Sequence, residues 1–317
     1  METQRHSIVQ NAQNILGQLC KVIVGKDKVL LWTLAAILAK GHILLEDIPG
    51  VGKTTMAVAF SRVLGLDYNR VQFTPDVLPS DITGYSVLNQ ITGAMEYRRG
   101  AVLCNLFLAD ELNRATSRTQ SALLEAMEER QVTVDGVSHN VPAPFIVIAT
   151  QNPTGAAGTQ LLPDSQIDRF VVSLSLGYPD PKDEVTMLLQ RQGSDPMNDL
   201  QPIVTAVELA QMQQTVAQTF VSQEIAAYVV DLVDATRRST LLMRGASPRA
   251  TLALAAVSKA IARLRGRDYV VSKDVQESFL TTIAHRLQLS AEADGQGMDM
   301  EQVLKNILGK VPTPKLS

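Results

Sequence analysis

The segment 49–55, which reads Pro-Gly-Val-Gly-Lys-Thr-Thr, contains the residue types that bind a polyphosphate. Glycine lets the backbone curl so that successive N–H groups point at an anion, and a helix that starts in such a loop adds its positive end. Lys53 would contact the β- and γ-phosphates, and the Thr54 hydroxyl would bind Mg²⁺. The sequence therefore predicts a nucleotide-binding loop made of Pro49, Gly50, Val51, Gly52, Lys53, Thr54 and Thr55.

The residues around this loop fit the prediction, with one departure. Apolar residues 43–45 precede it as a short buried strand, and a helical pattern follows it as far as Gly65. The generic loop pattern has glycine at position 47, where this chain has Asp47. Aspartate tolerates unusual backbone angles better than most residues, so the turn can still form. A strand-to-helix turn without a ligand is the alternative, and the Gly-Lys-Thr triplet disfavours it.

Two carboxylates follow a second apolar run. Residues 106–109 are apolar without interruption, which suits a strand covered on both faces, and Asp110 and Glu111 come directly after them. Open α/β sheets bind ligands at the carboxyl ends of their strands. We expect Asp110 to hold Mg²⁺ through its water shell. Glu111 points the other way and is expected to polarise an attacking water.

A third apolar run, residues 145–149, ends in Thr150-Gln151-Asn152-Pro153. A polar side chain at this strand end would lie between the two carboxylates and the γ-phosphate, so Asn152 is a candidate for orienting the water. An Asn-Pro pair also commonly starts a turn, and the residues alone favour a turn over a role in orienting water.

The composition is that of an ordinary globular protein and argues against several functions. The chain has 317 residues, of which 45% are hydrophobic and 19% charged, and its formal net charge is -3. This length suits two domains, and the negative charge argues against broad attraction to nucleic acid or anionic membranes. Cys20 and Cys104 have neither metal-ligand nor redox spacing, and no apolar run is long enough to span a membrane. We expect a cytoplasmic protein with no membrane span.

The pattern of elements changes near residue 180. Before it, predicted helices alternate with strands at residues 43–45, 68–73, 106–109, 145–149 and 171–176, and hairpins are predicted at 85–98 and 131–141. After it, helices are predicted at 182–191, 205–217, 222–237, 248–265, 272–289 and 298–308, with a polar, mobile stretch at 291–297. We therefore predict an α/β nucleotide-binding domain over residues 1–180 and a helical lid domain over residues 181–317.

The predicted position of Arg249 in its helix is electrostatically unfavourable. Ser247 is a good helix N-cap and Pro248 suits the first helical position, which places Arg249 in the first turn, where the helix end is already partly positive. Such conflicts tend to occur at functional sites, and an anion such as a γ-phosphate would remove this one. A solvated surface arginine is the equally weighted alternative.

The chain resembles the AAA+ ATPases and, within them, the MoxR family, over nearly its whole length. The ordered set of motifs is far more specific than any one of them. The residues that carry the resemblance are LLEDIPGVGKT (44–54), VQFTPDVLPSDITG (71–84), LADELNRA (108–115), QSALLEAMEERQVTVDG (120–136), IATQNP (148–153), LPDSQIDRF (162–170) and GASPRA (245–250).

The resemblance implies a fold and a set of roles. The fold would be a five-stranded parallel sheet flanked by helices, then an all-α lid, with ATP and Mg²⁺ bound between them. Val24 and Gly25 would approach the adenine. Asn152 would be the sensor 1 residue and Arg249 the sensor 2 residue, while Arg169 would be an arginine finger that serves the nucleotide of the neighbouring subunit. Arg114 is a second candidate for that role.

The resemblance also implies a mode of action. MoxR proteins are similar to chaperone-like remodellers that form rings, here expected to be hexameric, and that often act with partners carrying a von Willebrand factor A domain. The two hairpins would face a pore or a partner. A motor on nucleic acid and a nucleotide-gated scaffold with little turnover are the competing hypotheses, and the net charge disfavours the first of these.

Overall fold

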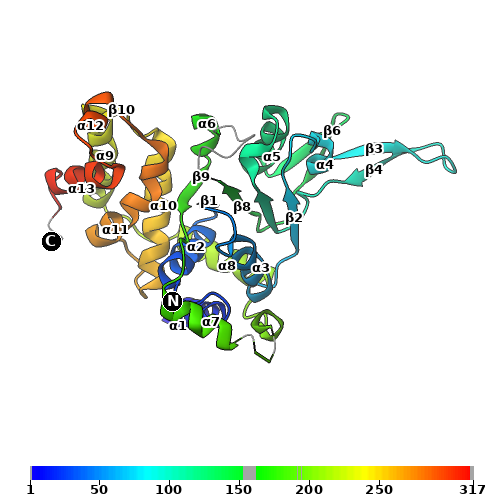
Figure 1. Ribbon diagram of the computed structural model, residues 1–317, viewed down its shortest axis with the longest axis horizontal. Coiled ribbons are helices and arrows are strands. Elements are labelled where there is room, and N and C mark those ends of the chain that lie inside the picture. The colour runs from blue at the N-terminus through cyan, green and yellow to red at the C-terminus, as the bar shows by residue number, and fades with distance from the viewer. Residues whose placement is uncertain (1, 153–161, 191, 194, 315–317) are drawn as a thin grey trace.

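The computed structural model describes residues 2–152, 162–190, 192–193 and 195–314, and a parallel sheet lies at its centre (Figure 1). Within these residues the sheet has five strands, all parallel to their neighbours. Their order is β2 (Tyr68–Gln72), β5 (Leu106–Asp110), β8 (Ile146–Gln151), β1 (His42–Glu46) and β9 (Phe170–Leu174). The predicted five-stranded parallel sheet is confirmed.

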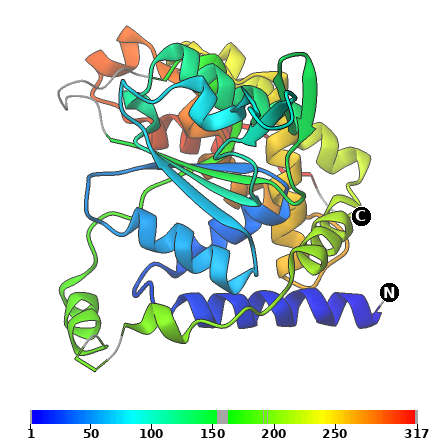
Figure 2. The ribbon, with the colours of Figure 1, turned by 90° about the vertical axis from the view of Figure 1, so that its right-hand side faces the viewer.

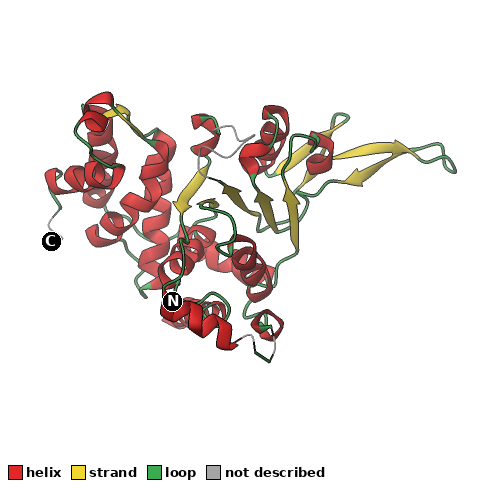
Figure 3. Cartoon of the chain, viewed as in Figure 1, coloured by secondary structure: helices red, strands yellow, loops and turns green. Residues whose placement is uncertain are grey.

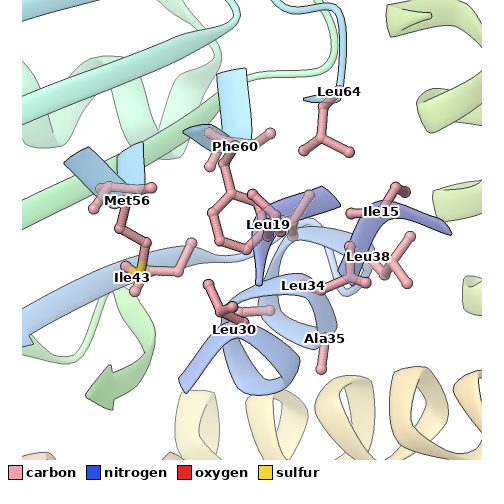
Figure 4. Close-up of a cluster of buried hydrophobic side chains, with 14 of the residues drawn as sticks. Ile15, Leu19, Leu30, Leu34, Ala35, Leu38, Ile43, Met56, Phe60 and Leu64 are labelled. Carbon is pink, nitrogen blue, oxygen red and sulfur yellow. The ribbon is translucent and has the colours of Figure 1, made fainter. Parts of the chain in front are cut away.

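The inner strands β5, β8 and β1 carry apolar runs because both faces of the sheet are covered there (Figure 2), whereas the edge strand β2 is largely polar and partly exposed. Side chains alternate between two hydrophobic clusters, so Ile43 and Leu45 pack in one and Leu44 in the other. Figure 4 shows part of the first cluster, where Phe60 lies beside Leu19. The helices of that face are α1 (Glu2–Leu19), α2 (Asp27–Leu38), α3 (Lys53–Val63) and α8 (Ala206–Ala217), and α5 (Ser117–Glu129) covers the other.

The C-terminal part is mostly helical (Figure 3). Its own cluster of buried side chains joins α9 (Gln223–Arg238), α10 (Pro248–Leu264), α11 (Ser272–Ile283) and α13 (Met300–Lys310). Helix α10 also packs on the core, because Val257 and Ile261 belong to the cluster of α1 and α2 while Leu254 faces the lid. One long helix therefore fixes the lid against the sheet domain. The connecting segment contains α7 (Pro181–Gln190) and a 3₁₀ turn, Pro196–Asp199. Leu188 of α7 lines one cleft with Val22 and Val24, which follow α1.

Both predicted hairpins are present. The first, β3 (Gly84–Leu88) with β4 (Met95–Arg99), projects from the body (Figure 1), and Ile91 at its tip is 95% exposed. The second pairs β6 (Gln131–Val134) with β7 (Val137–Asn140) and follows α5 directly.

Two local predictions were wrong. The two prolines of residues 74–79 predict a loop, but a short helix, α4 (Pro79–Thr83), begins at the second of them, because Pro79 suits a first helical position and Asp81 accepts a hydrogen bond from the Leu78 N–H. The sequence at residues 117–120 predicts a capping box that starts with Ser117, but the N-cap of α5 is Thr116, whose hydroxyl accepts from the Thr119 N–H.

The lid also differs in detail from its prediction. Helix α11 ends at Ile283, and a 3₁₀ turn, Ala284–Arg286, follows it. The strands β10 (Leu242–Arg244) and β11 (Gln288–Leu289) then form a small antiparallel pair in an otherwise helical domain. The stretch predicted to be mobile contains the helix α12 (Ala291–Gly295), whose Ala293 is fully buried. Arg191, predicted to end a helix, and Pro153 of the IATQNP motif lie outside the described residues.

Two buried histidines should make stability depend on pH. Burial lowers the pKa of His42 and of His285 to about 3, so both stay neutral in the folded chain. The unfolded chain takes up these protons as pH falls below about 6.5, and the folded chain does not. We expect the free energy of unfolding to fall by about 2 kcal/mol per histidine between pH 7 and pH 5. Urea titrations at the two pH values measure this, and equal stabilities would contradict it.

Candidate nucleotide-hydrolysis site

The backbone of the 49–55 loop has the shape that the sequence predicted. Gly50 and Gly52 have φ values of 87° and 97°, a left-handed region that favours glycine. Gly52 directly precedes Lys53, the first residue of α3, so the N–H groups of that helix end face the loop. A Cβ atom at Gly50 or Gly52 would meet nothing within 4 Å, which shows that φ and not crowding requires glycine at both positions.

Lys53 is buried at the centre of the site. Its ammonium group donates to the main-chain oxygens of Asp47 and Ile48 and, at 3.4 Å, to Oδ1 of Asn152. Burial lowers the pKa of Lys53, and the nearby carboxylates of Asp47, Asp110 and Glu111 oppose that shift. The amine is therefore held at the carboxyl edge of the sheet by neutral acceptors, which charged phosphate oxygens can replace.

The departure at Asp47 has a structural reason. Its carboxylate accepts hydrogen bonds from the Gly177 N–H at 2.7 Å, the Ser175 hydroxyl at 3.0 Å and the Ile48 N–H at 2.9 Å. Burial raises the pKa of Asp47, but these hydrogen bonds outweigh it and the pKa is lowered. The charged side chain thus ties the loop to the segment after β9, which a glycine could not do.

Asp110 ends strand β5 and is engaged on both of its oxygens. The Thr150 hydroxyl donates to Oδ1 at 2.7 Å, and the Arg70 guanidinium binds Oδ2 at 2.7 Å. Hydroxyl and carboxylate oxygens suit a hard cation, so Thr54 and Asp110 fit Mg²⁺ as donors. No group of three or more histidine, cysteine or acidic side chains among the described residues is arranged to hold a metal. A metal held here would therefore also need phosphate oxygens or water.

Glu111 is held in a fixed place beside Asp110. Its φ is 56°, and its N–H donates to the Thr150 hydroxyl at 2.8 Å. Arg114 binds Oε2 at 2.8 Å, and Nδ2 of Asn152 donates to Oε1 at 3.1 Å. Hydrogen bonding from Arg114 is the largest cause of a lowered pKa, so Glu111 is a carboxylate at neutral pH. The structure therefore joins Lys53, Asn152 and Glu111 in one hydrogen-bonded chain.

A cleft of about 580 Å³ opens beside the loop. Val24 and Thr55 are among its lining residues, together with side chains of the α7 segment such as Tyr178 and Leu188. Gly25 adjoins it, and its φ of 72° lies in the left-handed region that favours glycine. An apolar cleft continuous with the phosphate loop suits a nucleobase, and contact with the base stays the role that the resemblance implies for Val24 and Gly25.

Arg169 and Arg249 lie at the other edge of the sheet. Arg169 immediately precedes Phe170, the first residue of β9, which pairs with His42 at the start of β1. The phosphate loop follows the opposite end of β1, and a five-residue strand is roughly 15 Å long. Arg249 lies beside Arg169, because both bind the carboxylate of Glu128. Neither arginine is thus placed beside Lys53 of its own chain, although Arg249 was expected to reach that site from the lid.

Comparison with known proteins settles the family. A family model for the "ATPase family associated with various cellular activities (AAA)" matches residues 42–172, and an AAA lid domain model matches residues 234–307. The chain is 38% identical over 318 residues to the chaperone MoxR1 of Mycobacterium tuberculosis, covering 98% of this chain and 84% of that protein. The chain belongs to the MoxR family of AAA+ ATPases.

Two further similarities agree with this assignment. The chain is 44% identical over 294 residues to YeaC of Bacillus subtilis, covering 93% of this chain and 92% of that one. A crystal structure described as that of an ATPase, from Cytophaga hutchinsonii, superposes with a TM-score of 0.91 at 34% identity and covers 99% of this chain and 98% of its own. This MoxR-family chain is an ATP hydrolase with an AAA+ core and a helical lid. Within its described residues, no helix has the length and apolar character to cross a membrane.

Sequence reasoning missed three residues that contact the candidate site residues of this MoxR-family chain. Thr150 bridges Asp110 and the Glu111 N–H, and a hydroxyl at the end of the apolar run 145–149 was the available signal. Arg70 pairs with Asp110 from the neighbouring strand, and an arginine in a predicted strand could have pointed to it. Glu128 gave no such signal, because nothing in the pattern of α5 distinguishes it from Glu125 or Glu129.

Proposed function

We propose that this chain is a Mg²⁺-dependent ATPase that works as a ring, expected to be hexameric, in which each subunit completes the site of the next. One observation carries the proposal. Lys53, Glu111 and Asn152 gather at the carboxyl edge of the sheet, whereas Arg169 and Arg249 gather at the opposite edge. Each chain thus carries one half of its own nucleotide site and, at the opposite edge, one half of a neighbour's site. Head-to-tail packing would join the two halves.

The residues at the carboxyl edge would hold and orient the reactants. The N-terminus of α3 and Lys53 bind the phosphates, and Asn152 exchanges its contact with Lys53 for the γ-phosphate or the attacking water. Glu111, ionised and fixed by Thr150, accepts a hydrogen bond from that water. Thr54 and Asp110 would hold Mg²⁺, which neutralises charge on the phosphates when it is bound.

The arginines would act on the neighbouring subunit. Charge on the γ-phosphoryl group spreads over its oxygens during transfer, and a guanidinium placed there stabilises it. Arg169 comes from the core domain and Arg249 from the lid, so ATP bound next door would contact both domains at once. This contact gives a route from hydrolysis to movement of the lid against the core.

The protein acted on is proposed from the family and from the surface. The relative in Mycobacterium tuberculosis is named a chaperone, and the corresponding partner here is a client or adaptor protein, such as one with a von Willebrand factor A domain. The β3–β4 hairpin supports this, because Tyr85, Leu88, Ile91 and Met95 are all at least half exposed on it. A cytoplasmic location and the domain boundary near residue 180 stay predictions.

The concentration dependence of turnover tests the proposal. Phosphate release per subunit should rise steeply as the chain assembles, because a lone subunit lacks the arginines of its neighbour. Binding of a fluorescent ATP analogue, measured over the same range, should change little and serves as the control. Constant turnover per subunit, down to dilutions at which light scattering shows only monomers, would contradict shared sites.

A further inference from the structure

Glu128 holds two arginines that come from different domains. Its Oε2 accepts from Nε of Arg169 at 3.0 Å and from the terminal nitrogen of the same guanidinium at 2.9 Å. Its Oε1 accepts from a terminal nitrogen of Arg249 at 2.5 Å. Arg169 lies at the start of β9 and Arg249 in the first turn of lid helix α10, so one carboxylate of α5 fixes the spacing between them.

The cavity on one side of this carboxylate is strongly cationic, while Glu125 and Glu129 line a second cavity with it. A cavity of about 280 Å³ is lined by Lys40, Arg130, Arg169 and Arg249 together with Glu128. His42, also in its wall, is neutral because burial lowers its pKa to about 3. One carboxylate therefore faces four cations. The excess positive charge suits an anion with several oxygens, such as a phosphate group.

Glu128 leaves most of the donors of both arginines in place for such an anion. A guanidinium has five N–H donors. Arg169 gives Glu128 one edge and places another nitrogen 2.8 Å from the Ser165 carbonyl, and Arg249 uses a single nitrogen. Exposed ion pairs of this kind add only about 0–1 kcal/mol to stability, so holding the fold together is a minor part of what Glu128 does. Its larger effect is on where the two guanidinium groups point, because without Glu128 their like charges would repel and the two side chains would move apart.

We propose that Glu128 is a positioning residue that sets Arg169 and Arg249 as a pair for the nucleotide of the adjoining subunit. This inference rests on the proposed function. It adds that the two arginines work as one unit through a carboxylate that touches no substrate, and that this carboxylate acts on the neighbour's site and not on its own.

The test is Glu128→Gln, which keeps the shape and removes the charge. An amide oxygen can accept from one arginine, but the amide nitrogen cannot accept from the other, so the pair separates. We expect kcat of the assembled protein to fall about tenfold to a hundredfold, as for a misplaced catalytic group, with ATP affinity unchanged. Glu125→Gln is the matched control, since Glu125 lies one turn earlier on α5 and makes no ion pair among the described residues; its kcat should stay at the wild-type value.

A mixing experiment shows on which subunit Glu128 acts. Glu128→Gln subunits keep Glu111, and Glu111→Gln subunits keep Glu128, so each alone is expected to retain at most about a tenth of wild-type turnover. When equal amounts assemble together, about a quarter of head-to-tail interfaces join an intact Glu111 to an intact Glu128. Recovery of roughly that fraction of wild-type turnover is the expected result. A parallel mixture of Arg169→Ala with Glu111→Gln tests the shared site itself.

Each other outcome overturns a definite statement. Wild-type kcat for Glu128→Gln would overturn the inference. A low kcat with no recovery on mixing, while the Arg169→Ala mixture does recover, would show that Glu128 acts within its own subunit and would overturn it too. In both cases the shared site stands. If neither mixture recovers, the shared site and the inference fail together.

Discussion

Replacing Arg169 with alanine is expected to lower ATP turnover by a factor of about 10³–10⁵ while leaving the affinity for ATP nearly unchanged. This loss corresponds to about 4–7 kcal/mol of transition-state stabilisation. The reason is geometric, because Arg169 lies at the start of β9 and the phosphate loop of the same chain lies at the far end of β1. ATP binding uses the loop, which the change does not touch. Steady-state phosphate release at assembly concentration and binding of a fluorescent ATP analogue measure the two effects.

A matched control separates catalysis from the joining of core and lid. Arg244 is a lid arginine that, like Arg249, binds a carboxylate of the core; its partner is Asp164, at 2.6 Å, and it is more exposed than Arg169. Arg244→Ala removes an ion pair between the domains without touching Glu128, so its turnover should stay within about twofold of wild type. Full turnover by Arg169→Ala would show that Arg169 takes no part in the shared site. Equal losses in both variants would assign the effect to domain packing.

The half of the site at the carboxyl edge was predictable because its signals are local. Lys53 follows two glycines and an apolar strand, and Asp110 with Glu111 ends another apolar strand. Parallel strands bring their carboxyl ends to one edge, so sequence-distant residues such as Asn152 are brought beside Lys53 by topology alone. A prediction based only on where the strands end therefore identifies which residues lie together in this half of the site.

The placement of Arg249 was not predictable in the same way. Periodicity identified α10 and its N-cap Ser247, but where the lid docks depends on tertiary contacts. The Ser247 hydroxyl donates to Asp168 at 2.8 Å, and buried Arg286 donates to the Phe170 carbonyl at 2.6 Å. Both contacts attach the lid to the start of β9, which brings Arg249 to Arg169 and Glu128. No pattern within α10 specifies those partners.

Short elements were missed for a related reason. The helix α4 and the strands β10 and β11 have five, three and two residues, too few for a period of 3.6 or 2 to show. Their determinants are single contacts, such as the hydrogen bond from the Leu78 N–H to Asp81. The tertiary pairing of Leu242 with Leu289 joins residues that no local pattern connects.

Glu111→Gln is expected to lower kcat by about 10²–10⁴-fold and to leave ATP bound without being hydrolysed. The glutamine keeps the size of the side chain, and its oxygen can still accept from Asn152, so the phosphate loop and its affinity should persist. What it loses is the negative charge that accepts a proton or hydrogen bond from the water. Arg114 and Asn152 hold the pKa of Glu111 below its usual 4.5, so in the native enzyme this charge is present throughout the neutral range. Single-turnover phosphate release, with retention of ATP through gel filtration, measures both effects.

The control for this variant lies at the end of the neighbouring strand, β8. Thr150→Val removes the hydroxyl that accepts from the Glu111 N–H and donates to Asp110, but it leaves the Glu111 charge intact. Turnover should then fall less than in Glu111→Gln, because the base is displaced and not neutralised. If Glu111→Gln hydrolyses ATP at the wild-type rate, another group must activate the water. Loss of ATP binding in that variant would instead show that Glu111 shapes the phosphate loop, and its assignment as the base would fail.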